Sequence, residues 1–193
     1  MSIALRRLKL ILPGALIVIL SLPSETFAQK EIQSFSAKNA LYVEFGGSSG
    51  RYAVNYSRIV HQKGKLRLNV SGGFSLLRSS ITMRDFSSTK WLPVIPLEFS
   101  ALWGRSNHHL EAGVGFTSFL DQGVELDLDT YETSTKVAFG AVIPFRLGYR
   151  YQKPGGGFFY RIGYTPFFNL PVGGREDWVF TPIFAGVSFG KSF

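Results

Sequence analysis

The last eleven residues of the chain, 183–193, read IFAGVSFGKSF and alternate between two kinds of side chain. Every second residue from the start of this segment is apolar, with Lys191 as the exception, and the residues between them are mostly glycine and serine. Because successive side chains of a β-strand point to opposite faces, this period of two predicts a strand with one apolar face and one small, polar face. The apolar face collects Ile183, Ala185, Val187, Phe189 and Phe193.

The same alternation recurs in seven earlier segments, and no stretch of the chain after residue 28 shows a sustained helical period. The chain also contains 21 glycines, 18 phenylalanines and 8 tyrosines, a composition that favours an all-β class over a helical one. We therefore predict an all-β fold of eight antiparallel strands in up-and-down order. The predicted strands are residues 40–46, 51–60, 66–76, 91–103, 109–119, 136–151, 158–168 and 183–193.

The connections between these strands alternate in length. Short polar turns are predicted at residues 61–65, 104–107 and 152–156, and long polar loops at residues 78–90, 121–134 and 169–179. The first connection, GGSSG at residues 46–50, is predicted to be a tight hairpin because glycine tolerates positive φ. Short turns at one end and longer loops at the other are typical of transmembrane β-barrels, and eight strands leave a lumen that side chains can fill.

The chain resembles the small eight-stranded outer-membrane β-barrels of the OmpA/OmpX type. Three segments, GGSSGRYAVNYSRIV, IPLEFSALWGRSNHHLEAGVGF and GYRYQKPGGGFFYRIGYTPF, look like recurring segments of uncharacterised exported barrel proteins from Gram-negative bacteria. The resemblance implies a monomeric barrel over residues 39–193, with outer-membrane lipids and lipopolysaccharide as its surroundings. It also implies that the terminal strand, through Phe189 and Phe193, is the signal read by the barrel-assembly machinery.

The amino-terminal 28 residues have the pattern of a secretory signal peptide. Arg6, Arg7 and Lys9 precede an apolar core at residues 10–22, and small residues lead to a cleavage site after Ala28. Residues 29–38 are polar and aperiodic, and we expect them to form a short periplasmic tail. The chain has no cysteine, which excludes disulfides, thiolate metal sites and a lipoprotein anchor.

Charged residues fall on the face of the predicted strands that carries small side chains. If the apolar face points outwards to lipid, these charges point into the lumen, where burial is costly unless each charge is paired. We therefore predict a structural acid–arginine network, and we prefer this interpretation to an ion pathway because eight strands leave little open bore. The predicted members are Glu44, Arg67, Glu98, Glu111, Arg146 and Arg161, with His109 near one end.

Two other candidate sites are weaker. The acidic stretch ELDLDTYET at residues 125–133 could bind calcium, but it lacks the glycine and ligand spacing of a dedicated calcium loop. The three histidines, His61, His108 and His109, show no recognisable nucleophile–base spacing to a serine. We therefore expect no catalytic residue, cofactor or metal site, and we see no nucleic-acid module that the formal charge of +8 would serve.

The expected function is a structural or surface-interaction role through the extracellular loops. Two alternatives stay open, which are a lipid A or phospholipid-modifying enzyme and a narrow channel. The rival fold is a soluble eight-stranded barrel of the lipocalin kind, which would place its apolar side chains inside and its charges outside.

Overall fold

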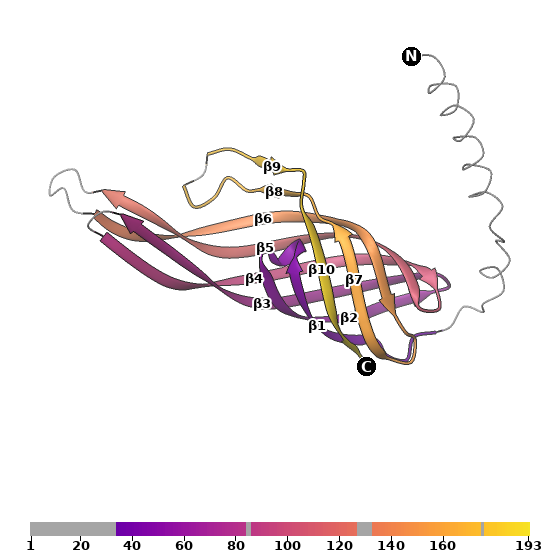
Figure 1. Ribbon diagram of the computed structural model, residues 1–193. Helices are drawn as coiled ribbons and strands as arrows, with labels where there is room; N and C mark the ends of the chain where they lie inside the picture. Colours follow the sequence, from indigo (N-terminus) through magenta and orange to yellow (C-terminus); the bar gives the residue numbers. More distant parts are fainter. Residues whose placement is uncertain (1–33, 84–85, 127–132, 175) are drawn as a thin grey trace, which may run out of the picture. The chain divides into compact units, whose positions relative to one another are not determined.

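A computed structural model describes residues 34–83, 86–126, 133–174 and 176–193 of the chain (Figure 1). These residues form ten antiparallel strands in one sheet, together with one short 3-10 helix, and no α-helix occurs among them. The elements are β1 (Asn39–Gly46), η2 (Gly47–Ser49), β2 (Tyr52–Lys63), β3 (Leu66–Met83), β4 (Phe86–Arg105), β5 (His108–Leu126), β6 (Thr133–Gln152), β7 (Gly157–Tyr164), β8 (Phe167–Asn169), β9 (Val179–Thr181) and β10 (Ala185–Ser192). The predicted all-β class is confirmed.

The strands pair in the order β5-β4-β3-β2-β1-β10-β7-β6-β8-β9, and β5 also pairs with β6. Each of the strands β1 to β7 and β10 therefore has a hydrogen-bonded neighbour on both sides. The last strand, β10, pairs with the first, β1, in a register that places Val43 opposite Phe189. The terminal residue continues this pairing, since Phe193 and Asn39 exchange backbone hydrogen bonds of 2.9 and 3.0 Å.

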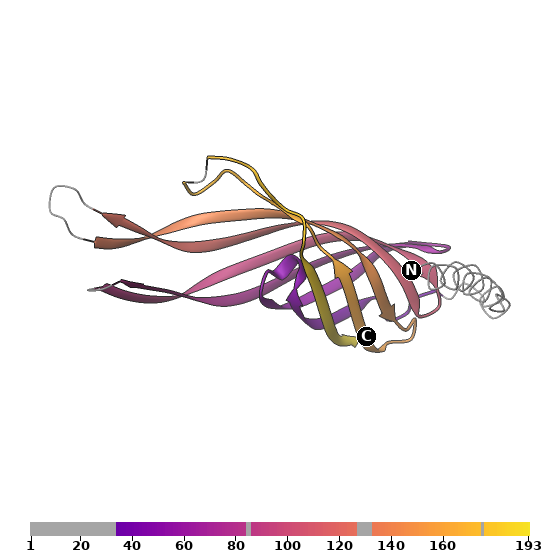
Figure 2. The same cartoon turned by 45° about the horizontal axis from the view of Figure 1, so that its top comes forward.

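Two of the three predicted long loops are wrong, because the strands on either side of them continue as hairpins. The β3–β4 pairing runs to Met83 opposite Phe86, and the β5–β6 pairing runs to Leu126 opposite Thr133. The pairing between β4 and β5 ends earlier, at Val94 opposite Phe119, and beyond that point the two hairpins diverge (Figure 2). These extensions are rich in polar side chains, so they do not show the apolar alternation by which the other strands were predicted. The backbone hydrogen bonds of a strand pair form without apolar side chains.

Prolines mark the places where the remaining predicted boundaries fail. The predicted strand at 158–168 is divided into β7 and β8 around Pro166, and the predicted loop at 169–179 begins and ends within β8 and β9. Pro182 separates β9 from β10, so the closing strand begins at Ala185 and not at residue 183. Pro166 and Pro182 have no backbone N–H to donate to a ladder, and neither position belongs to a strand.

Burial alternates along the strands in the sense that the sequence predicts. On β5, Leu110 is 65% exposed whereas its neighbour Glu111 is 1% exposed. The same inversion holds on β1, where Leu41, Val43 and Phe45 are exposed and Tyr42 and Glu44 are buried. Apolar side chains outside and charges inside are the opposite of a lipocalin-like barrel, so that rival fold is contradicted.

The segment that precedes β1 is attached to the rest of the sheet and is not a free tail. Phe35 and Ala37 are buried, and the backbone N–H groups of Ser36 and Ala37 both donate to the carbonyl of Pro154 in the β6–β7 turn. The signal peptide predicted at residues 1–28 and the first part of the tail, residues 29–33, lie outside the described residues. No helix in the described residues is long and apolar enough to cross a membrane.

A row of glycines lets β6, β7 and β10 approach one another on the buried face. Gly148 pairs with Gly163, which in turn pairs with Gly186. A Cβ at position 148 would lie 2.3 Å from the carbonyl oxygen of Ile162, which is closer than real Cβ atoms come to other heavy atoms. Small side chains at this level are therefore a requirement of the strand pairing.

We predict that Gly148→Ala lowers the free energy of unfolding by about 1–3 kcal/mol, because the added methyl group forces the β6–β7 ladder apart. Gly155→Ala is the matched control, since a Cβ at this turn position has nothing within 4 Å. Urea unfolding followed by tryptophan fluorescence measures both. Equal free energies of unfolding for the two variants would contradict this prediction, because they would show that β6 and β7 can accommodate a methyl group at position 148.

Candidate functional site: a buried ionic network

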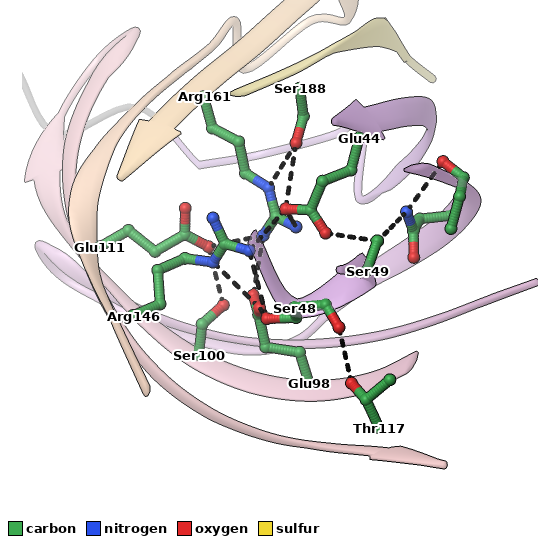
Figure 3. A network of polar contacts seen from close by, with 12 residues as sticks. Glu44, Ser48, Ser49, Glu98, Ser100, Glu111, Thr117, Arg146, Arg161 and Ser188 are labelled. Carbon is green, nitrogen blue, oxygen red and sulfur yellow. Dashed lines mark hydrogen bonds and ion pairs between the residues drawn. The ribbon is translucent and has the colours of Figure 1, made fainter. Parts of the chain in front are cut away.

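The centre of the site is Arg161 of β7, which contacts three carboxylates at once (Figure 3). Its Nη2 lies 2.9 Å from Glu44 Oε1, and its Nη1 lies 2.7 Å from Glu98 Oε1 and 3.3 Å from Glu111 Oε1. These glutamates belong to β1, β4 and β5, none of which is β7's neighbour in the sheet. One guanidinium therefore holds together strands that share no backbone ladder with its own.

A second arginine, Arg146 of β6, bridges two of the same carboxylates. Its Nη2 donates to Glu44 Oε1 at 2.5 Å, and its Nε donates to Glu98 Oε2 at 2.9 Å. Glu98 thus uses one oxygen for each arginine. Charge-assisted hydrogen bonds of this kind are about twice as strong as neutral ones, and two arginines sharing two carboxylates fix the geometry from several directions.

A third arginine, Arg150 of β6, completes the charge balance. Its Nη2 lies 2.5 Å from Glu111 Oε1, and its guanidinium stacks over the ring of Phe159 at 5.2 Å. Three arginines and three glutamates, all 6% exposed or less, therefore neutralise one another. The sequence places Arg150 on the buried face, but the prediction of the network omits it.

Serine and asparagine side chains extend the network to the remaining strands. Ser188 of β10 accepts from Arg161 Nε at 3.0 Å, and Ser100 of β4 donates to Glu111 Oε1 at 3.0 Å. Asn69 of β3 donates to Ser100, and Asn55 of β2 donates to Ser49, both at 3.3 Å. With these links, each of the strands β1 to β7 and β10 contributes a buried side chain to one connected set of contacts.

The glycine-rich hairpin that the sequence predicts between β1 and β2 is confirmed, with Gly46, Gly47 and Gly50 at positive φ, and its turn also folds onto this network. Its residues form η2, in which Ser49 Oγ donates to Glu44 Oε2 at 2.6 Å and Ser48 Oγ donates to Glu98 Oε2. The side chain of Thr117 in β5 also binds η2, because its hydroxyl donates to the carbonyl of Ser48 at 2.6 Å. A Cβ at position 47 would lie 2.6 Å from Glu44 Oε1, so only glycine lets the turn come this close to the charges.

Below the network, on the side away from η2, aromatic rings and cations fill the interior. The guanidinium of Arg67 lies 4.4 Å from the centre of the Phe35 ring and donates to the carbonyls of Lys65 and Gly104. His109 packs edge-on against Phe35 at 5.4 Å. We refer to this end as the Phe35 end and to the opposite end as the η2 end.

The structure brings together most of the predicted site residues. Glu44, Glu98, Glu111, Arg146 and Arg161 meet in the ionic network, whereas Arg67 lies in the layer at the Phe35 end. The two predicted assembly residues, Phe189 and Phe193, are about half exposed on the apolar face. The serines of η2 were missed because their sequence, GGSSG, reads equally well as an exposed turn.

The other candidate sites of the sequence receive no supporting contact. His108 Nδ1 lies 2.5 Å from the Tyr149 hydroxyl, and within the described ranges no histidine ring is hydrogen-bonded to a serine or threonine. Most of the acidic stretch at residues 125–133 lies outside the described residues. Comparisons with protein-family models, curated proteins and solved structures gave no match to this chain.

We predict that Glu98→Ala lowers the free energy of unfolding by about 3–5 kcal/mol, because it leaves Arg146 and Arg161 buried with fewer counter-charges. Glu176→Ala removes a carboxylate from an exposed loop position and should change the free energy by no more than about 0.5 kcal/mol. Urea titration of the folded protein compares the two. A small effect of Glu98→Ala would mean that the network adds little to the fold.

Proposed function

We propose that the protein is an outer-membrane β-barrel of eight transmembrane strands with a filled lumen, and that it acts through its structure and surface contacts. The observation that carries this proposal is the inverted burial pattern, in which charges are buried and large apolar side chains are exposed on strands that each have two neighbours. Soluble monomers rarely expose apolar patches larger than a few hundred Å². Lipid is the solvent in which such a surface is stable.

Aromatic residues near the strand ends support the same proposal. Tyr149, Tyr151 and Tyr160 cluster where β6 ends and β7 begins, with ring centres 5.2 to 5.8 Å apart for the pairs that include Tyr160. Trp103 near the end of β4 is 56% exposed. Tyrosine and tryptophan concentrate at membrane–water interfaces, so we assign the Phe35 end to one interface of the bilayer.

The long hairpins lie at the opposite end of the sheet from the Phe35 end. The β3–β4 and β5–β6 hairpins extend past the ends of β1, β7 and β10, each of which has only eight residues (Figure 1). In the proposed topology the Phe35 end is periplasmic and the hairpins are extracellular. Surface binding through these hairpins is then the natural role of the protein, and lipopolysaccharide is the surface nearest to them.

The contents of the interior argue against a channel. The ionic network lies across the interior, η2 covers it on one side, and Phe35 and Arg67 occupy the other. A continuous column of water through the interior could form only if several of these charge-assisted hydrogen bonds were broken. We therefore propose a closed lumen, with insertion guided by the carboxy-terminal strand and its Phe189 and Phe193, and with export directed by residues 1–28.

The proposed location and topology can be tested with single-cysteine variants, because the native chain has no cysteine. Thr89→Cys places a thiol on the β3–β4 hairpin, and Lys153→Cys places one in the β6–β7 turn, both at exposed positions. A membrane-impermeant maleimide should label the Thr89 variant on intact cells, and the Lys153 variant only after the outer membrane is permeabilised. Equal labelling in detergent serves as the control.

Labelling of Lys153→Cys on intact cells, or failure to label Thr89→Cys there, would contradict the proposed topology.

A further inference from the structure

A cavity of about 230 Å³ lies directly above η2, and it is lined by apolar side chains. Strands β3 to β6 and β8 supply its walls, while the shorter β1, β7 and β10 end below it. The apolar lining contrasts with the ionic network on the other side of η2. The wall residues are Leu77, Val94, Phe119, Val142, Pro144 and Phe167.

The floor of this cavity is also less polar than its sequence suggests. Ser48 and Ser49 line it, but their hydroxyl groups donate to Glu98 and Glu44 in the network below. The Thr117 hydroxyl is likewise used, because it donates to the carbonyl of Ser48. A ligand in the cavity would therefore meet carbon surface on most sides, which suits an alkyl chain.

A second cavity of about 380 Å³ adjoins the first and shares Arg51, Leu77 and Phe119 with it. Its lining is polar and includes Arg78, Ser79, Ser80 and Asp121. Asp121 accepts a hydrogen bond of 2.9 Å from the backbone N–H of Gln122. Within the described residues no ion pair is formed by Arg51 or Arg78, and both residues line the second cavity.

We propose that the η2 end binds a single-chain amphiphile with an anionic head group, of which a fatty acid is the simplest. The alkyl chain would occupy the apolar cavity, and the carboxylate would lie at Arg51 and Arg78. A volume of about 230 Å³ is smaller than the ~300 Å³ at which pockets for drug-sized ligands begin, and so it favours one chain over a ring system or a diacyl lipid. Two arginines against one aspartate favour an anion over a cation.

This inference goes beyond the proposed function, because the cavities are formed by the strands themselves and do not depend on the membrane that holds them. A protein that bound the amphiphile but lay elsewhere in the cell would contradict the proposed location and leave the site intact. A protein that was exposed at the cell surface but failed to bind the amphiphile would contradict the proposed site and leave the proposed location intact.

The test uses full-length protein in lipid nanodiscs and a photoreactive laurate with a diazirine near its methyl end. After irradiation, peptide mass spectrometry locates the cross-links, which should fall on cavity residues such as Leu77, Val94 and Phe119. Unlabelled laurate should compete, whereas dodecyltrimethylammonium, with a chain of equal length and the opposite charge, should compete at least about tenfold less well. Cross-links confined to outward-facing side chains would overturn the proposal, since they would report only lipid-dissolved probe.

Three variants separate the two parts of the site. Val94→Trp fills the apolar cavity and should abolish cavity cross-links. The double variant Arg51→Gln, Arg78→Gln leaves the cavity intact and should weaken laurate competition by about tenfold, because a charge-assisted contact is lost at each position. Arg58→Gln, at an exposed position of β2 that lines neither of the two cavities, is the matched control and should behave as the native protein. Unchanged competition by laurate in the double variant, whose substitutions are at exposed positions, would overturn the proposal even if Val94→Trp fails to fold.

Discussion

The buried arginine–glutamate network is the interaction on which the rest of this structure depends. Because the strands expose their apolar faces, their polar faces must meet in the interior, and there an unpaired charge would cost more than the fold could supply. Arg161 resolves this by contacting Glu44, Glu98 and Glu111 together. A slip of one residue in any strand would turn its network member to the apolar side, so the network also specifies the register of the strands that contribute to it.

The interior is arranged in layers from one end to the other. Aromatic rings and Arg67 fill the Phe35 end, the ionic network follows, η2 covers the network, and the apolar cavity lies above η2. The serines of η2 connect two of these layers chemically. By giving their hydroxyl groups to Glu44 and Glu98, they complete the network and leave the cavity apolar. The same turn thus closes the proposed lumen and forms the floor of the proposed ligand site.

Much of this arrangement could be predicted from the sequence, because it follows from alternation. The period of two located the strands and assigned Glu98 and Arg146 to the buried face. The period of two could not predict the hairpin extensions of β3 to β6, because the residues of these extensions do not alternate between apolar and polar side chains. Nor could it show that η2 folds inwards, since this depends on the close approach of Gly47 to Glu44, a contact between side chain and backbone that no local pattern encodes. The apolar cavity was missed because its residues, such as Val94 and Phe119, lie where the predicted strands give way to predicted loops.

The most direct test of the account is the ionic conductance of the purified protein in a planar lipid bilayer. If the network and η2 close the interior as described, the native protein should insert without steady conductance steps, and Glu98→Ala, which opens the network, should give intermittent current. Stable open-channel conductance by the native protein would contradict the account, because ions would then be crossing the layer in which Arg146 and Arg161 hold their carboxylates.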